Sequence, residues 1–272
     1  MAEISAADVM KLRKATGAGM MDCKAALQES NGDFDAAIDI IRKKGQLVAS
    51  KRADRDATEG AVIAKSSGNK GAFIILNCET DFVAKNENFV AFAHSILDIA
   101  LENLPADLDA LKALKFGNKT VGDRVTEEVG LIGEKLDLSF YGKIEAAEVV
   151  AYIHPGNKLA TMVGFNKKTS GHVGKDIAMQ IAAMSPVAVD KENVSAEMIA
   201  KEKEIGREQA RLEGKPENML DKIAEGKVNK FFKEFTLLNQ DFTKDSKKTV
   251  RQYLKESDSD LTVTEFIRQS LK

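Results

Sequence analysis

The chain has 272 residues, of which 43% are hydrophobic and 30% charged, with a formal net charge of -2. This composition is typical of a folded globular protein, and its balanced charge argues against nucleic-acid binding as the main role, because nucleic-acid-binding domains usually carry a basic surface. No uncharged run approaches the roughly 18 residues of a membrane span, and Met1 to Ser5 lack the features of a signal peptide. We expect the two cysteines, Cys23 and Cys78, to stay reduced, so the composition predicts a soluble cytoplasmic protein with no membrane partner.

Residues 1–45 predict a module of three short helices. Ser5 and Asp8 have the spacing of a capping box, which marks the start of the first helix. Glycines 17 and 19 end that helix. Because three short helices bury little apolar surface, we expect the module to be marginally stable by itself.

Apolar spacing and capping residues also predict the second and third helices of this module. Met20, Cys23 and Leu27 recur at the spacing of one helix face, so they predict an apolar stripe. Asp33 caps the third helix, and Gly45 is expected to stop it.

A linker and a β-hairpin come next. Residues 46–58 are rich in charge and show no single apolar stripe, which predicts a linker that could be helical. Apolar runs at 62–64 and 72–76 flank a turn signal at 66–69, and together they predict a hairpin. It opens a first core subdomain, which we place at 59–140.

The most conspicuous segment follows that hairpin directly. Thr80, Asp81, Phe82 and Val83 place a carboxylate beside a phenyl ring, between a strand and a helix predicted over 87–104. Unusual side chains on a rigidly held loop are a better functional hint than core residues are. Asp81 could instead begin the next helix while Phe82 folds back onto the core.

The second half of the chain repeats this plan. Gly68-Asn69-Lys70 recurs 88 residues later as Gly156-Asn157-Lys158, in the turn of a second predicted hairpin. The apolar face of the following helix recurs at the same offset, although chance could also match three turn residues. We interpret the repeat as two related α+β subdomains with antiparallel strands, the second at 141–190 and 229–245. Lys167-Lys168-Thr169-Ser170 stands near the place of the acidic-aromatic segment, so the shared fold does not require that segment.

Two further segments complete the organisation. Residues 191–228 are rich in charge and predict an antiparallel helical hairpin that projects, because its apolar residues are sparse. Its arms are expected to meet along Ile199, Ile205 and Leu212 on one side and Met219, Ile223 and Val228 on the other. Residues 246–272 predict a C-terminal helical module, in which Thr249 caps a helix.

Several site types lack support. No segment matches the phosphate-binding loop pattern, and His94, His154 and His172 are too scattered to predict a metal site. No local signature of a nucleophile appears either, although a cysteine and a histidine could meet in space.

Two long motifs resemble bacterial translation elongation factor Ts. They are Thr16 to Leu27, with the sequence TGAGMMDCKAAL, and Asn77 to Ala84, with the sequence NCETDFVA. The resemblance extends over nearly the whole chain, including Glu59-Gly60, the paired hairpins and Leu237 to Gln240. The chain departs from the family at Asp241, where a proline is common, and it ends sooner after Arg268 than some relatives do.

The resemblance implies a nucleotide exchange factor, with no cofactor or metal of its own, that binds elongation factor Tu in its GDP form and speeds GDP release. It implies that a UBA-like N-terminal module contacts the GTPase domain through Arg13, Met20 and Met21. Met20 shares the stripe of Cys23 and could be mainly core.

The same resemblance implies that Asp81 and Phe82, flanked by Thr80 and Val83, enter the partner beside its Mg²⁺ and nucleotide site. His154, in the second hairpin turn, would be a further contact, unless it is an ordinary surface histidine. The helical hairpin could mediate a homodimer, as in some relatives.

Two other classes of function stay open at this stage. A passive adaptor would use the helical module and the projecting hairpin only to recruit partners. A hydrolase would use Asp81 with a histidine brought near in space.

Overall fold

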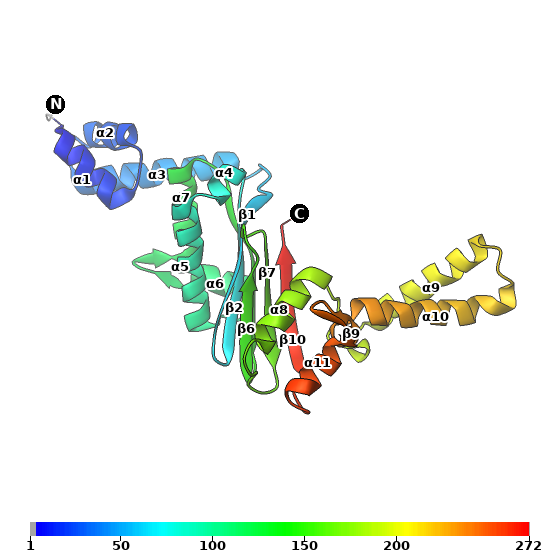
Figure 1. Ribbon diagram of the computed structural model, residues 1–272. Coiled ribbons are helices and arrows are strands. Elements are labelled where there is room, and N and C mark those ends of the chain that lie inside the picture. Colours follow the sequence, from blue (N-terminus) through cyan, green and yellow to red (C-terminus); the bar gives the residue numbers. More distant parts are fainter. Residues whose placement is uncertain (1–3, 272) are drawn as a thin grey trace.

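A computed structural model describes residues 4–271 and shows an elongated α+β protein. The N-terminal helices lie at one end, two sheets form the middle, and a helical hairpin projects from the other side (Figure 1). The predicted fold class is therefore confirmed.

The N-terminal helices are α1 (Ala6–Thr16), α2 (Met20–Glu29) and α3 (Phe34–Arg52). Ser5 and Asp8 form the predicted capping box, and Gly17 ends α1 in the left-handed conformation at φ 74°. A small core joins the three helices and consists of Val9, Leu12, Ala18, Cys23, Ala26, Leu27 and Ala37.

The prediction that Gly45 stops the third helix is wrong. α3 continues to Arg52, so about half of the predicted linker at 46–58 is helix. Gly45 is buried against Gly130 of α7 (Val121–Ile132), and a Cβ on Gly130 would lie 2.4 Å from the Gly45 Cα. The glycine here permits a close helix crossing, a role that its position along the chain does not reveal.

The first sheet has the antiparallel order β1-β2-β5, formed by β1 (Glu59–Ser67), β2 (Lys70–Cys78) and β5 (Leu136–Glu145). Helices α4 (Asp81–Ala84), α5 (Glu87–Asn103), α6 (Leu108–Ala113) and α7 cover its outer face. Between α6 and α7 lies a small hairpin of β3 (Lys115–Phe116) and β4 (Lys119–Thr120). The hairpin of β1 and β2 and the helix after it are as predicted.

The second sheet has the order β10-β7-β6, formed by β6 (Glu148–Ile153), β7 (Leu159–Phe165) and β10 (Val263–Ser270). Helices α8 (Val173–Met184) and α11 (Val250–Ser257) pack on its outer face. The C-terminal segment 246–272 is therefore not an entirely helical module. α11 is the predicted helix capped by Thr249, whereas β10 completes the sheet by pairing with β7, about 100 residues earlier in the chain.

The two sheets pack face to face. Their shared core consists of Val62, Ala64, Phe73 and Ile75 from the first hairpin, with Ile144, Val149, Ala160 and Met162. The molecule thus has four layers in its middle, with helices outside each of two sheets. This sandwich gives the loops at its ends a rigid support.

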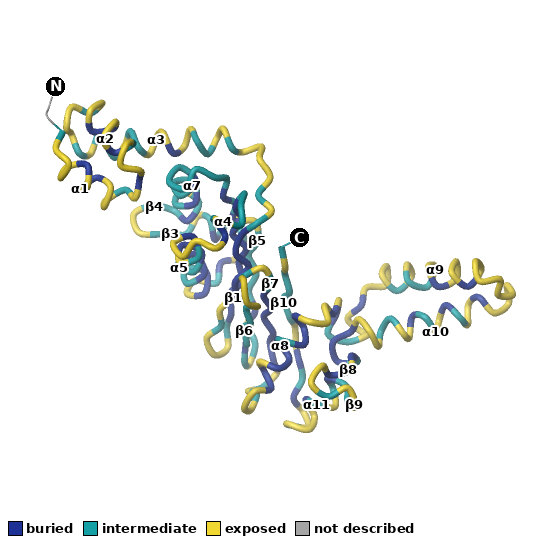
Figure 2. The backbone as a smooth tube through the Cα atoms, turned by 45° about the horizontal axis from the view of Figure 1, so that its top comes forward, coloured by how far each residue is buried: buried dark blue, intermediate teal, exposed yellow. Residues whose placement is uncertain are grey.

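The projecting hairpin consists of α9 (Ala196–Leu212) and α10 (Glu217–Phe235), and Figure 2 shows that most of its length is exposed. The expected seam is partly wrong, because Ile205, Leu212 and Met219 are exposed. The buried positions are instead Gly206 and Ala210 on α9, and Leu220, Ala224 and Val228 on α10. Gly206 faces Ala224 across the seam, and a Cβ on Gly206 would lie 3.2 Å from the Ala224 Cα. The two arms therefore approach closely at this point, where a larger side chain would not fit.

The hairpin joins the second sheet through short elements. These are the 3₁₀ turns η1 (Lys191–Asn193) and η2 (Leu237–Asn239) and the strands β8 (Asp241–Phe242) and β9 (Asp245–Thr249).

Candidate functional site

The segment Thr80 to Val83 forms an exposed tip at the end of β2. Thr80 is the N-cap of α4, and its hydroxyl accepts a hydrogen bond from the Val83 backbone N–H at 3.4 Å. Phe82 is 84% exposed, the highest value for a large hydrophobic residue in the part of the chain that the structure describes. Both views in the sequence analysis were partly right, because Asp81 does begin a short helix, but Phe82 does not fold back onto the core.

A carboxylate from a distant loop holds the base of the tip. Glu134 accepts hydrogen bonds from the Thr80 hydroxyl at 2.6 Å and from the Thr80 backbone N–H at 3.0 Å. Val83 and Ala84 pack against the core beneath the first sheet. The backbone that carries the exposed ring of Phe82 is therefore held on both sides.

Asp81 carries a negative charge beside this ring. Lys85 donates a hydrogen bond to its carboxylate at 2.6 Å, and this bond together with the lysine charge lowers the pKa of Asp81. Asp81 is therefore ionised at neutral pH.

Glu79, immediately before the tip, is a residue that sequence reasoning missed. Its carboxylate accepts hydrogen bonds from the Lys135 backbone N–H at 2.6 Å, from Arg52 at 2.8 Å and from Arg55 at 3.1 Å. The bond from Lys135 and those from the two arginines lower the pKa of Glu79 to about 2. The sequence signal that could have singled out Glu79 was its place within the motif Asn77 to Ala84. No sequence signal pointed to Glu134, since its partner Thr80 lies 54 residues away.

The second hairpin turn lies at the same end of the sheets as the tip. His154 is exposed in that turn, and its Nδ1 is 2.9 Å from the Tyr152 hydroxyl. Lys158, at the end of the turn, is near enough to contribute to the lowered pKa of Asp81. The structure thus brings His154 and the tip to one end of the sandwich.

Arg13, Met20 and Met21 lie on the N-terminal module, apart from the tip. Arg13 is exposed in the last turn of α1, and Met20 and Met21 are 50% and 77% exposed at the start of α2. The alternative that Met20 is mainly core is wrong, because the first turn of α2 extends past the small three-helix core. Met10, one turn before Arg13, is also exposed and was missed.

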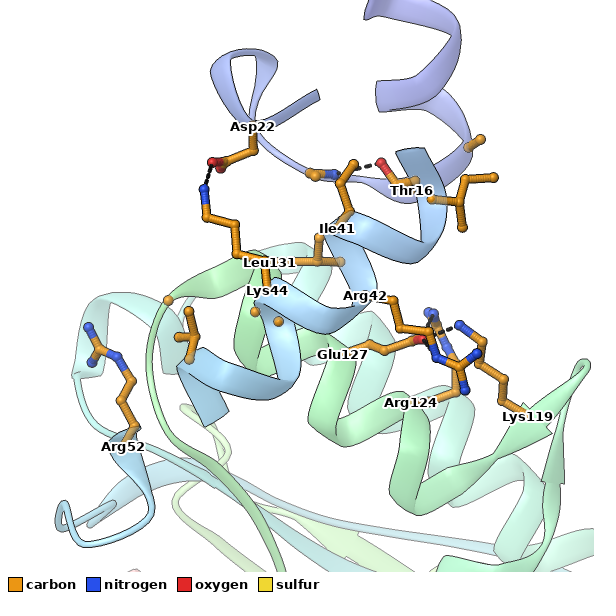
Figure 3. Close-up of a pocket in the computed structure, with 18 residues that line it drawn as sticks. Thr16, Asp22, Ile41, Arg42, Lys44, Arg52, Lys119, Arg124, Glu127 and Leu131 are labelled. Atoms are coloured by element: carbon orange, nitrogen blue, oxygen red, sulfur yellow. Dashed lines mark hydrogen bonds and ion pairs between the residues drawn. The ribbon is translucent and has the colours of Figure 1, made fainter. Parts of the chain in front are cut away.

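A cavity of about 360 Å³ marks the junction between this module and the core. Figure 3 shows Arg124 and Lys119 beside Glu127 of α7, with Arg42 of α3 on the other wall. Glu127 pairs with Lys119, with Arg124 at 3.0 Å and with Arg42 at 3.8 Å. The pair of Arg42 with Glu127 and the close contact of Gly45 with Gly130 join α3 to the core.

Residues 4–271 contain neither a metal-binding cluster nor a helix that could span a membrane. No three His, Cys, Asp or Glu side chains come together there as a metal ion would require. No helix in that range combines the length and the apolar character needed to cross a bilayer. Burial raises the pKa of the Cys78 thiol to about 12, and this thiol donates to the Thr80 carbonyl. It is therefore a poor nucleophile.

Comparisons with known proteins find similar sequences over nearly the full length of the chain. The family model for elongation factor Ts matches residues 79–272, which begin at the base of the tip. The chain is 51% identical over 265 residues to elongation factor Ts of Porphyromonas gingivalis, covering 97% of each chain. It is 52% identical to that of Christiangramia forsetii and 50% identical to that of Flavobacterium psychrophilum, each over 275 residues and 100% of both chains.

Proposed function

Because the chain belongs to the elongation factor Ts family, we propose that it is a guanine nucleotide exchange factor for elongation factor Tu in the cytoplasm. It binds the GDP form through the N-terminal module, with contacts from Arg13, Met20 and Met21. The tip disturbs the Mg²⁺ and phosphate site of the partner, so that GDP leaves and GTP can bind. The chain itself makes and breaks no covalent bond, and nucleic acid is not a direct partner.

One observation carries the proposal, namely that Phe82 is almost fully exposed on a backbone that Glu134 and the core hold in place. Burying a phenylalanine side chain contributes roughly 1.5 to 3 kcal/mol. Because the backbone is already ordered, little of that free energy is spent on ordering the tip when it binds. The free energy gained by burying Phe82 can therefore stabilise a conformation of the partner in which helices near the nucleotide site are displaced.

Asp81 gives the tip its second effect. Its ionised carboxylate would lie near the metal site of the partner and compete with the groups that order Mg²⁺. Loss of the ion weakens the hold on the phosphates, because a bound divalent cation is the largest local charge in such a site. His154 lies at the same end of the sheets and adds a contact with the partner.

Thermodynamic linkage makes the exchange reversible. If this protein weakens GDP binding by some factor, GDP weakens the binding of this protein by the same factor. The intermediate complex is then resolved by whichever nucleotide arrives, and exchange needs no chemical energy of its own.

The test is stopped-flow release of a fluorescent GDP from elongation factor Tu at saturating factor. Phe82→Ala is expected to slow release roughly tenfold, with only a modest loss of binding. Phe235→Ala is the matched control, because Phe235 is 41% exposed and is the last residue of α10, in the projecting hairpin. The proposal is wrong if Phe82→Ala releases GDP at the parental rate.

The same measurement separates the other two classes of function. A passive adaptor predicts binding to elongation factor Tu without faster release. A hydrolase predicts turnover of some substrate without any partner, and the high pKa of Cys78 already argues against a thiol mechanism.

A homodimer through the helical hairpin is a further part of the proposal. Met198, Ile205 and Leu212 are exposed at intervals of seven residues along α9, which suits contact with another helix. Light scattering of the complex would show one or two copies of the chain.

A further inference from the structure

Glu79 connects two parts of the molecule that the proposed function treats separately. It follows strand β2 and precedes the tip, yet its carboxylate binds Arg52 at the end of α3 and Arg55 just beyond it. The side chain of Glu79 is only 14% exposed, and that of Arg52 is 27% exposed. The ion pair is thus much better shielded from water than a typical surface pair.

Lys135 closes the same connection from the other side. Its backbone N–H donates to Glu79, while its Nζ donates to the carbonyls of Ala53 at 2.7 Å and Arg55 at 2.9 Å. The neighbouring residue, Glu134, holds Thr80. Three segments therefore meet in one cluster, namely the end of α3, the base of the tip and the loop between α7 and β5.

The rest of α3 is fixed to α7 as well. Gly45 contacts Gly130 closely, and Leu131 packs against the small core of the N-terminal module. The N-terminal module is thus joined to the core along α3. Glu79 connects the C-terminal end of α3 to the base of the tip. A shift of α3 would be transmitted to the residues that carry Asp81 and Phe82.

We infer that Glu79 is a positioning residue that couples the N-terminal module to the tip. The inference rests on the proposed function. Binding of the partner to Arg13, Met20 and Met21 then places the tip in register with the nucleotide site, because α3 is bonded to the base of the tip through Glu79. Without Glu79 the module still binds, but the tip is no longer held in that register.

The first test measures GDP release over a range of factor concentrations for Glu79→Gln. The amide keeps an acceptor for Lys135 and loses the charge that holds Arg52 and Arg55. The maximal release rate should fall about fivefold, within the range for residues that link two sites, while the half-maximal concentration changes little. Asp98→Asn is the matched control, because Asp98 pairs with Lys65 at 2.6 Å and lies on α5, which is not one of the three segments of the cluster.

The second test asks whether Glu79 acts through the tip. In a Phe82→Ala background, Glu79→Gln should cause little further loss of maximal rate, whereas independent effects would multiply. Arg52→Lys, which keeps a positive charge, should retain more activity than Arg52→Ala. A thermal melt of each variant separates loss of coupling from unfolding, and if Glu79→Gln does not fold, the two Arg52 variants carry the test.

Failure of this inference differs from failure of the proposed function. If the parental protein does not speed GDP release, the proposed function is wrong. If it does, but Glu79→Gln keeps the parental maximal rate, or slows release equally with and without Phe82, the coupling role of Glu79 is wrong.

Discussion

The loops that follow β2 and β7 each lead from the second strand of a hairpin to a helix, yet they present opposite chemistry. Both are fastened by a carboxylate, since Glu134 accepts from the Thr80 backbone N–H and Glu148 accepts from that of Thr169 at 2.6 Å. The first loop then exposes Phe82 beside Asp81. The second exposes only small or polar side chains and is tied down by Lys167, which pairs with Asp258 at 2.8 Å.

We interpret this difference as separating features of the fold from features of the proposed function. An anchoring carboxylate recurs in both loops, so it serves the architecture. An exposed aromatic ring occurs in one loop only, and no packing in the described chain requires it. The ring is therefore best explained by contact with another molecule.

The largest expected effect comes from giving the first loop the chemistry of the second. The double variant Asp81→Thr, Phe82→Ser keeps the anchors Thr80 and Val83 and removes both the ring and the charge. GDP release from elongation factor Tu should slow roughly 10- to 100-fold, because the burial of the ring is lost. Thermal unfolding should hardly change, since both side chains are exposed, and normal exchange by this variant would refute the distinction between the loops.

A smaller effect is expected from the two anchoring carboxylates, which form a matched pair. Glu134→Gln and Glu148→Gln should each lower the free energy of unfolding by about 1 to 2 kcal/mol, because each weakens a charged hydrogen bond to the backbone. Only Glu134→Gln should also slow GDP release several-fold, since only it loosens a functional tip. Denaturant unfolding and release kinetics on both variants check this, and equal effects on release would contradict it.

The smallest effect is expected from the ion pair on the tip. Lys85→Ala lets the pKa of Asp81 rise toward its ordinary value, which is still far below 7, so the carboxylate stays ionised at neutral pH. Release at pH 7 should therefore hardly change, whereas Asp81→Asn removes the charge at every pH and should slow it. A matching loss in both variants would show that Lys85 itself contacts the partner.

Much of the fold was predictable from short patterns. Ser5 with Asp8, and Asp33, mark helix starts through side chains that bond to backbone groups three residues away. Turn residues and alternating apolar runs marked both hairpins. The strand β10 was not predicted, because its partner β7 lies about 100 residues earlier and no local signal reports that pairing.

The candidate site was predictable to a similar degree. Asp81 and Phe82 stand out because their chemistry is unusual at the end of a strand, and the exposure of Phe82 agrees with that prediction. What holds them was not visible, since Glu79 and Glu134 look like ordinary surface carboxylates. Met20 was ambiguous because helical spacing says which face a residue shares, but not how far the small core extends.

Local patterns in this chain determined the helix caps, the hairpins and the residues of the tip, because those depend on neighbours within a few positions. Tertiary packing decided that α3 passes Gly45, that β10 completes a sheet, and that Glu79 joins α3 to the tip. Those features depend on contacts such as that of Glu79 with Lys135, which lie 56 positions apart. Such partners come together only when the whole chain has folded.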